Sequence, residues 1–384
     1  MKLLIACLLL ASAAYAESPA EVGIRMAQTE IAKRPDHYPY YNDLAGAYVR
    51  RARETSDAIY FQKAEETLAQ GFAIAPDNFD GLKVRTRLLL GRHEFAKALE
   101  LAARLNKQTP DDVAVYGYLA EANAELGNYK AAAEAGQWML NIRPGNPAGL
   151  AIAGYLRGLL GYIGPAIEVT QMALDATPYQ QTEERAWLLV RLAHLHVLAG
   201  NLAQAETSAT RALGLFPWYP VGLGALAEVR IAQQRYDEAV TLLQTLYEEA
   251  PRAANLYAVG KALQLAGRKN EADAAFAEFE RKALGESAMA DNANRELIAW
   301  YVDAAHKPAQ ALRLAEQEIA RRHDAFTLDC YAWALAANGD TRRAAAEIHE
   351  ALAAGVRDPG ILRHADLIAQ RPGAAPARPG DVRE

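Results

Sequence analysis

The first candidate for chemistry in this sequence is a glycine-rich run at residues 222–227, which reads Gly-Leu-Gly-Ala-Leu-Ala. The pattern is close to G-x-G-x-x-A, in which glycines let the backbone approach the phosphates of a dinucleotide. That chemistry requires a strand before the run and a helix that begins within it. Here the run follows Pro217 and Pro220 and lies within a helical pattern. We interpret it as a closely packed helix and predict no nucleotide cofactor.

Histidine and cysteine side chains are the second candidate, as metal ligands or nucleophiles. His194 and His196 stand two residues apart, which on a helix points them about 200° away from each other, so they cannot bind one metal ion. We expect His196 to pack in the core and His194 to face the opposite surface of its helix. Cys330 lies within a helical pattern and is interpreted as buried packing. The sequence therefore predicts no metal site.

Motifs of the common enzyme classes are missing from the sequence. It has no P-loop, no H-E-x-x-H, no G-x-S-x-G and no paired C-x-x-C. We predict that the protein is not an enzyme and has no catalytic residues, although an active site assembled by tertiary contact stays open as an alternative. Its 41 basic and 47 acidic residues are interspersed, without the basic block that follows a phosphate backbone. Nucleic acid is therefore not an expected partner.

The elements that would position any site are helices that recur with a fixed period. The chain of 384 residues is 51% hydrophobic and rich in alanine, leucine, glutamate and arginine, which favour helices. Proline cannot donate to the preceding turn and restricts the residue before it, so a regular series of prolines indicates regular helix ends. The series has a spacing of 34 residues, interrupted once by five extra residues around 180–184: Pro76, Pro110, Pro144, Pro178, Pro217 and Pro251.

Small residues and turn residues recur between these prolines. Two antiparallel helices joined by a short turn approach closely only where side chains are tiny. Each repeat accordingly has a small residue in its expected first helix, a glycine at the turn and an alanine in its expected second helix. The turn glycines are Gly127, Gly161, Gly200, Gly267 and Gly339, and the second-helix alanines are Ala64, Ala132, Ala166, Ala205 and Ala239. Gly91 stands two positions too early for this pattern.

At this point the sequence resembles the tetratricopeptide-repeat family. The clearest unit is Tyr116-x-x-Leu119-Ala120-x-x-Asn123-x-x-x-Gly127-x-Tyr129-x-x-Ala132, which ends at Pro144. It matches the family's order of bulky, leucine, small, bulky, glycine, aromatic, alanine and proline, except that the family prefers an aromatic at the position of Asn123. The resemblance implies an all-α fold, a right-handed superhelical solenoid of antiparallel helix pairs.

The same register divides the chain into segments. We expect a lead-in helix within residues 17–37, about nine repeats over residues 38–356, a capping helix within 357–371 and a disordered tail over 372–384. Exposed ends of a repeat array need such caps, and the tail is rich in Pro, Ala, Gly and Arg. Residues 51–57 are expected to form an expanded, charged loop between two helices.

The N-terminus reads as an export signal. Lys2 is followed by an apolar stretch at residues 3–14, and Ala14-Tyr15-Ala16 places small residues at the positions required for cleavage after Ala16. The stretch is too short to span a bilayer, and no later segment is apolar for long enough. Cys7 resembles a lipoprotein acylation site, but too few apolar residues precede it to form an export signal. We expect a periplasmic or secreted protein with a signal peptide at residues 1–16.

The family resemblance implies that the first helices line a concave groove. Side chains expected on that face, and therefore candidates for contact with a protein or peptide, are Asn42, Glu121, Tyr155, Arg191, His194, Glu228, Lys261, Trp300 and Trp333. Exposed tryptophan is a common anchor of protein contacts. The two tryptophans could instead pack against a neighbouring repeat, and the charged residues could be an ordinary solvated face.

These expectations favour a non-enzymatic scaffold of the periplasm or cell envelope that binds a partner peptide or helix in the groove. Two alternatives stay open. One is an accessory factor in the assembly or secretion of an envelope complex, and the other is an enzyme or small-ligand binder that uses the groove. The sequence names no partner and no oligomeric state.

Overall fold

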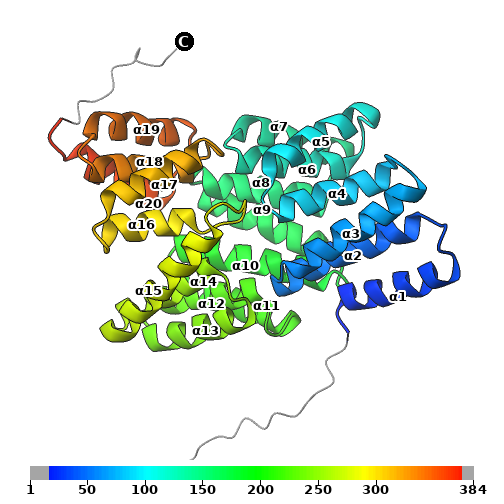
Figure 1. Cartoon of the computed structure of the whole chain (residues 1–384), viewed down its shortest axis with the longest axis horizontal. Coiled ribbons are helices and arrows are strands. Elements are labelled where there is room, and N and C mark those ends of the chain that lie inside the picture. The colour runs from blue at the N-terminus through cyan, green and yellow to red at the C-terminus, as the bar shows by residue number, and fades with distance from the viewer. Residues whose placement is uncertain (1–16, 374–384) are drawn as a thin grey trace, which may run out of the picture.

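The computed structural model describes residues 17–373, and within them the chain forms 20 helices and no strand. Helix pairs follow one another between α1 (Pro19–Lys33) and α20 (Pro359–Ala369) (Figure 1). This confirms the all-α solenoid that the repeat period predicts.

The first helices of the pairs are α2 (Pro39–Thr55), α4 (Phe79–Gly91), α6 (Val113–Glu125), α8 (Pro147–Leu159), α10 (Thr182–Leu198), α12 (Pro220–Ala232), α14 (Ala253–Leu265), α16 (Asn294–Asp303) and α18 (Ala325–Ala337). The second helices are α3 (Ile59–Ile74), α5 (Phe95–Gln108), α7 (Tyr129–Ile142), α9 (Ile163–Ala176), α11 (Leu202–Leu215), α13 (Tyr236–Glu249), α15 (Lys269–Glu286), α17 (Pro308–Ile319) and α19 (Thr341–Ala353).

Each proline of the 34-residue series stands two residues after the end of a second helix. α3 ends at Ile74 before Pro76, and α7 ends at Ile142 before Pro144. The next first helix then begins with its own cap. Asn146, for example, accepts hydrogen bonds from the backbone amides of residues 148 and 149 at the start of α8. Side-chain caps of this kind start α4, α6, α8 and α18, so both the ends and the starts of these helices are encoded locally.

The turn inside a pair uses one residue in the left-handed conformation, and glycine adopts it at the least cost. All five turn glycines of the sequence pattern have positive φ: Gly127, Gly161, Gly200, Gly267 and Gly339. In the α4–α5 turn the corresponding residue is His93, with φ 59°. Gly91 is instead the last residue of α4, where an added Cβ would lie 2.7 Å from the Phe61 ring. Its early position therefore reflects close packing, not a displaced turn.

The expected loop at residues 51–57 is mostly helix. α2 continues to Thr55, and only three residues separate it from α3. The extra turn is held by Glu54, which pairs with Arg51 at 3.0 Å and accepts a hydrogen bond from the Ser18 hydroxyl at 2.6 Å. Because these polar side chains are paired within one helical turn and with α1, the segment remains helical.

The alanines of the second helices fill the core, as the period predicts. Ala132, Ala166, Ala205 and Ala239 are fully buried. In a first helix, an added Cβ on Gly260 would lie 2.7 Å from the Phe276 ring. Side chains of this size let the paired helices approach closely, and any larger residue would force them apart.

The superhelix turns back on itself, so that its C-terminal part touches its middle. In Figure 1 the orange helices α17–α19 lie beside α7 and α8. The backbone amide of Arg357 donates to the carbonyl of Leu159 at 2.9 Å, and the amide of Ala325 donates to the Tyr129 hydroxyl at 3.0 Å. We call this contact, between residues 125–161 and residues 322–357, the seam.

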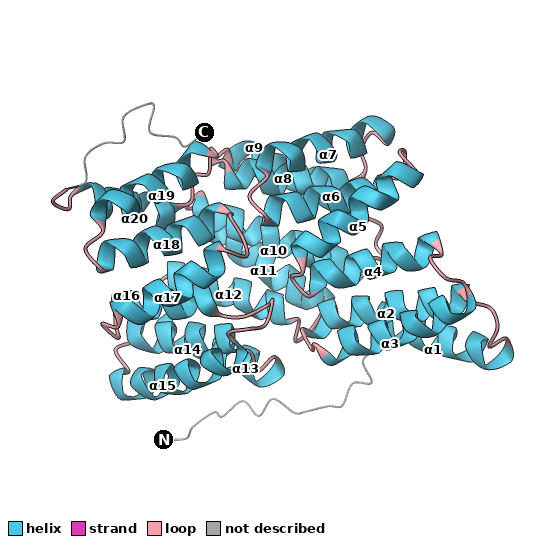
Figure 2. Ribbon diagram, turned by 45° about the horizontal axis from the view of Figure 1, so that its top comes forward, coloured by secondary structure: helices cyan, strands magenta, loops and turns pink. Residues whose placement is uncertain are grey.

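The ends of the described chain are helical caps. Ser18 caps α1 in a capping box with Glu21, and α20 packs against α18 and α19 (Figure 2). The expected signal peptide at residues 1–16 lies outside the described residues, as does the expected tail from residue 374 onward.

Candidate functional site

The first helices turn charged side chains toward the inside of the superhelix. We call the following set the inner face: Arg53, Arg87, Glu121, Glu125, Tyr155, Arg191, His194 and Glu228. Members from different helices interact electrostatically. Glu121 of α6 interacts with Arg53 of α2 and Arg87 of α4, and Arg191 of α10 interacts with Glu228 of α12. Acidic and basic groups both lie along the inside, so the inner face has no single sign.

Glu121 shows how the inner face differs from an ordinary helix surface. Its side chain is exposed, yet its pKa is raised, because protein atoms around it replace much of the surrounding water. Arg53 and Arg87 oppose this shift and Glu125 adds to it. Polar contacts to a bound chain are stronger in such partly dehydrated surroundings than on an open surface.

Tyr155 and Arg191 lie side by side on this face. The Arg191 guanidinium carbon is 5.0 Å from the centre of the Tyr155 ring, within the range of a cation–π contact. The Tyr155 hydroxyl is 3.5 Å from Oε1 of Glu125. Burial lowers the pKa of Arg191 and raises that of the Tyr155 phenol. The structure therefore brings these two groove candidates together in partly dehydrated surroundings.

His194 and Glu228 form the next contact along the inner face. Nδ1 of His194 lies 2.8 Å from Oε1 of Glu228, and each side chain is partly exposed. His196 is half-buried, and burial lowers its pKa. The two histidines therefore have separate surroundings. Within residues 17–373 no group of three or more His, Cys, Asp or Glu side chains is arranged to hold a metal ion.

An ion pair to a buried carboxylate lies at the start of the inner face. Nη2 of Arg53 lies 2.6 Å from Oε2 of Glu183, and the Tyr219 hydroxyl donates to Oε1 of the same carboxylate at 2.8 Å. Glu183 and Tyr219 are buried. This contact joins the end of α2 to the starts of α10 and α12, and it fixes the position of Arg53 beside Glu121.

Two predicted groove residues have other surroundings. Asn42 is only 6% exposed, and its amide donates to Oδ1 of Asn78 at 2.8 Å. It therefore joins two repeats and does not line an accessible surface. Lys261 is half-buried on α14, and its place in the groove stays a prediction.

Trp300 and Trp333 are half-buried in the packing of the C-terminal third. Trp300 stacks on Phe276 at a centroid distance of 6.0 Å, and its ring is also contacted by Lys307. Trp333 stacks on His364 of α20 at 4.4 Å and donates to Asp303 at 2.8 Å. The structure thus places both rings between neighbouring repeats, the arrangement that the sequence left open as the alternative to groove anchors.

The seam is the part of the site that sequence reasoning missed. Nη2 of Arg322 lies 3.2 Å from Oε2 of Glu125 on the inner face, and its Nε lies 3.1 Å from Asp324. The residues are 197 positions apart. Tyr129 and Gly127 lie at the seam, but both residue types are expected at these repeat positions in any repeat. The sequence therefore does not mark this repeat as the one that makes a tertiary contact. The seam brings the C-terminal repeats against one edge of the inner face.

His93 marks the same edge further toward the N-terminus. Loss of hydration lowers its pKa to about 4, and the guanidinium groups of Arg252, Arg322 and Arg295 add to this effect while Asp291 opposes it. These groups lie between residues 252 and 322, whereas His93 lies in the α4–α5 turn. This turn therefore also lies near the C-terminal repeats, on the N-terminal side of the seam.

The other reactive group considered from the sequence is Cys330. It is half-buried in α18, and burial raises the pKa of its thiol. A thiol with a raised pKa is a poor nucleophile near neutral pH, because the thiolate is the reactive form. The run at residues 222–227 lies within α12, where an added Cβ on Gly222 would lie 2.9 Å from Leu213. Gly222 therefore serves close helix packing, as predicted.

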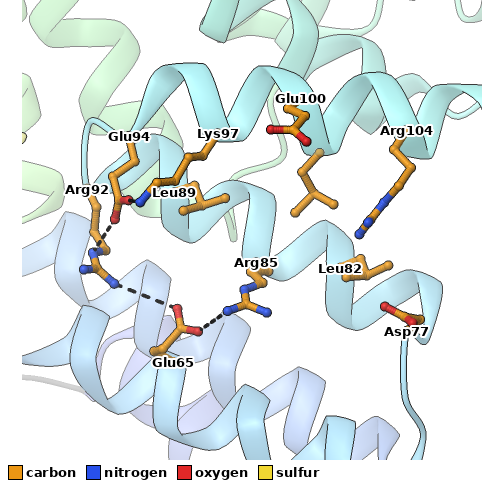
Figure 3. A pocket seen from close by; sticks show the side chains of 11 residues that line it. Glu65, Asp77, Leu82, Arg85, Leu89, Arg92, Glu94, Lys97, Glu100 and Arg104 are labelled. Atoms are coloured by element: carbon orange, nitrogen blue, oxygen red, sulfur yellow. Dashed lines mark hydrogen bonds and ion pairs between the residues drawn. The ribbon is translucent and has the colours of Figure 1, made fainter. Parts of the chain in front are cut away.

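A pocket of about 620 Å³ lies elsewhere, between α3, α4 and α5 (Figure 3). Glu65 pairs with Arg85 at 2.7 Å, and Glu94 pairs with Arg92 at 3.1 Å. Most charges that line it therefore already have partners in the chain. The pocket is distinct from the inner face, and its internal pairing gives it no preference for a ligand of one sign. Among the described helices none has the length and apolarity needed to cross a membrane.

Comparisons with known proteins agree with this geometry. A tetratricopeptide-repeat model matches residues 196–263, and no curated protein sequence matches the chain. The human IFIT1 dimer with m7Gppp-AAAA is 12% identical, with a TM-score of 0.53 over 86% of this chain and 84% of that chain. The APC/C hetero-tetramer Cut9–Hcn1 is 13% identical, with a TM-score of 0.50 over 90% of this chain and 58% of that one. At these identities the likeness concerns the fold.

Proposed function

Because the chain is a tetratricopeptide-repeat protein, a scaffold fold for protein–protein contacts, we propose that it holds a partner protein in the periplasm or cell envelope without catalysing a reaction. The partner supplies an extended peptide or a helix, which binds on the inner face. The observation that carries this proposal is the set of side-chain contacts along the inner face, where Arg191 lies 5.0 Å from the centre of the Tyr155 ring and His194 lies 2.8 Å from Glu228. These partly exposed polar and aromatic groups form a surface of the kind that a solenoid uses for binding.

The mixed charge of the inner face favours a protein over a nucleic acid as the partner. Glu121, Glu125 and Glu228 lie among the inner-face arginines. A phosphate backbone is bound by a continuous run of cations, and carboxylates within that run would repel it. A peptide that carries both acidic and basic side chains can satisfy this face.

Export is supported by the way the fold begins. The N-cap of α1 is Ser18, two residues after the expected cleavage bond, so cleavage would leave the capping box intact. Mass spectrometry of the protein recovered from the periplasm tests this point. A mature N-terminus at Glu17 is the expected result, and an intact Met1 would contradict it.

The binding proposal is tested by capture of partners from a periplasmic extract, with the wild-type chain and a Glu121→Gln, Arg191→Gln double variant as baits. The proteins retained by the wild type should be lost from the variant. Glu278→Gln, on the outside of α15, is the control and should retain them. Equal recovery by all three baits would exclude the inner face. The identity of the captured protein decides whether the role lies in assembly or secretion of an envelope complex.

A further inference from the structure

The outer face of α7 and α9 exposes large apolar side chains that the fold does not use. Trp138 is 53% exposed and Met172 is 54% exposed. They stand 34 residues apart and so occupy the same position on consecutive second helices. Ile142, one turn after Trp138, is 37% exposed, and Tyr116 stacks on the tryptophan at a centroid distance of 6.1 Å. Grouped exposed apolar side chains of this size are unusual on a surface without a partner.

Arginines limit this apolar surface on both sides. The same position is Arg104 on α5 and Arg211 on α11, and both side chains are exposed. The apolar side chains are therefore restricted to two neighbouring helices. We call Tyr116, Trp138, Ile142 and Met172 the outer apolar patch.

Unpaired carboxylates accompany the patch. Glu134 precedes Trp138 by one helical turn, and Glu168 precedes Met172 by one turn. Both are exposed, and neither has an ion pair or side-chain hydrogen bond with another described residue. Lys130 lies one turn before Glu134 and does not pair with it.

Two exposed carboxylates on other second helices are paired within the chain. Glu238 of α13 pairs with Arg235 at 2.6 Å, and Glu271 of α15 pairs with Arg268 at 2.7 Å. Each of these acids has an arginine three residues before it. The acids beside the outer apolar patch lack that arrangement and keep their charge available to another molecule.

We propose that the outer apolar patch is a second protein-binding surface and that it docks a basic amphipathic helix of a partner protein. Apolar side chains of that helix cover Trp138 and Met172, and lysine or arginine side chains beside them pair with Glu134 and Glu168. On both α7 and α9 a carboxylate is followed one helical turn later by a large apolar side chain. A helix laid between them can meet both with residues spaced by three or four.

This inference goes beyond the binding function proposed for the inner face and does not depend on it. First helices carry the inner face, whereas the outer apolar patch lies mainly on second helices. A chain with both surfaces holds two partners at once, one on each side of the helix layer.

The probe for a direct test is a synthetic helical peptide with leucines at helical spacing on one face and lysines flanking them. The counter-probe has glutamate in place of each lysine. Binding to the purified chain is measured by fluorescence anisotropy of the labelled peptide at two salt concentrations. The lysine peptide should bind, more weakly at high salt, and the glutamate peptide should bind at least tenfold more weakly. Equal binding of both peptides would overturn the proposal.

Variants locate the binding surface. Trp138→Ala with Met172→Ala should weaken the lysine peptide about tenfold or more, because large apolar anchors carry much of the affinity of an interface. Glu134→Gln with Glu168→Gln should weaken it less and reduce its salt dependence. These side chains are exposed, so the variants should retain the wild-type circular dichroism spectrum.

The matched control is Trp218→Ala, because Trp218 is 56% exposed in the α11–α12 turn, outside the patch. Its affinity for the lysine peptide should equal that of the wild type. Loss of affinity in this control to the same extent as in the patch variant would overturn the proposal. A dimer of the wild-type chain that dissociates in Trp138→Ala would also overturn it, since the patch would then bind a second copy. The Glu121→Gln, Arg191→Gln variant should bind the peptide normally, which separates this test from that of the inner face.

Discussion

The α6–α7 turn and the α14–α15 turn have similar backbones but different surroundings. Gly127 and Gly267 occupy the same repeat position, with φ 83° and 74°. A Cβ added to Gly127 would lie 2.6 Å from the carbonyl oxygen of His323, whereas one added to Gly267 would meet nothing within 4 Å. Both glycines allow the left-handed turn, and Gly127 additionally allows the close approach of residue 323 at the seam. A repeat position therefore has to be judged by its place in the superhelix as well as by its place in the repeat.

The largest difference is expected when both glycines are replaced by alanine. Gly267→Ala should lose about 1 kcal/mol of unfolding free energy, the cost of a left-handed non-glycine residue. Gly127→Ala should lose about 3 kcal/mol, because its methyl group also collides with the backbone of residue 323. Urea denaturation measures both values. Small-angle scattering should show a larger radius of gyration for Gly127→Ala alone, and equal losses in the two variants would argue against a tight seam.

A smaller effect is expected from the seam ion pair. Arg322→Ala removes the cation that lies between Glu125 and the buried Asp324, and it should cost about 2 kcal/mol. Arg235→Ala breaks an exposed pair with Glu238 and should cost about 0.5 kcal/mol or less. The comparison uses the same denaturation experiment. Similar costs for both variants would mean that the seam contact is open in solution.

The pH dependence of the unfolding free energy should also reveal the surroundings of His93 in the α4–α5 turn. The pKa of His93 is lowered to about 4, against 6.5 for an unperturbed histidine. Between these values the unfolded chain binds a proton that the folded chain does not, so stability falls as the pH drops from about 6.5 to 4. His93→Asn, which tolerates the left-handed conformation, should flatten this fall. An equally steep fall in His93→Asn and in the wild type would contradict this assignment.

The smallest change in stability is expected at the α12–α13 turn, which lies outside the seam and has glutamine in place of the turn glycine. Gln234 has φ 60° in the α12–α13 turn. Gln234→Gly should stabilise the chain by roughly 0.5–1 kcal/mol, because glycine adopts this conformation without steric strain. Thermal unfolding would detect a small rise in the midpoint. A fall would mean that the glutamine side chain contributes to packing around the turn.

Local features of the fold could be predicted from the sequence, because they arise within 34 residues. Pro144 ends α7, Gly127 makes the turn and Ala132 fills the contact between the paired helices. Each of these residues acts on its immediate neighbours, so a periodic pattern is sufficient to find it.

The seam and the contacts among inner-face side chains could not be predicted, because they depend on the pitch of the whole superhelix. Small rotations from one repeat to the next add up until Arg322 meets Glu125, and no single repeat encodes that sum. The tryptophans show the same limit. Trp333 stands on the groove face in register, but its ring is covered by His364 of the capping helix, whose packing angle a repeat pattern does not specify.

The hydrogen bond from the Arg357 amide to the Leu159 carbonyl also has a consequence for how the chain unfolds. An array in which each repeat touches only its neighbours behaves as a one-dimensional chain and can fray from either end. A contact between residues so far apart raises the contact order and makes the last repeats depend on the middle ones. Fraying from the C-terminus must then break the seam before it frees any repeat, so the described repeats from α6 onward should unfold as one cooperative unit.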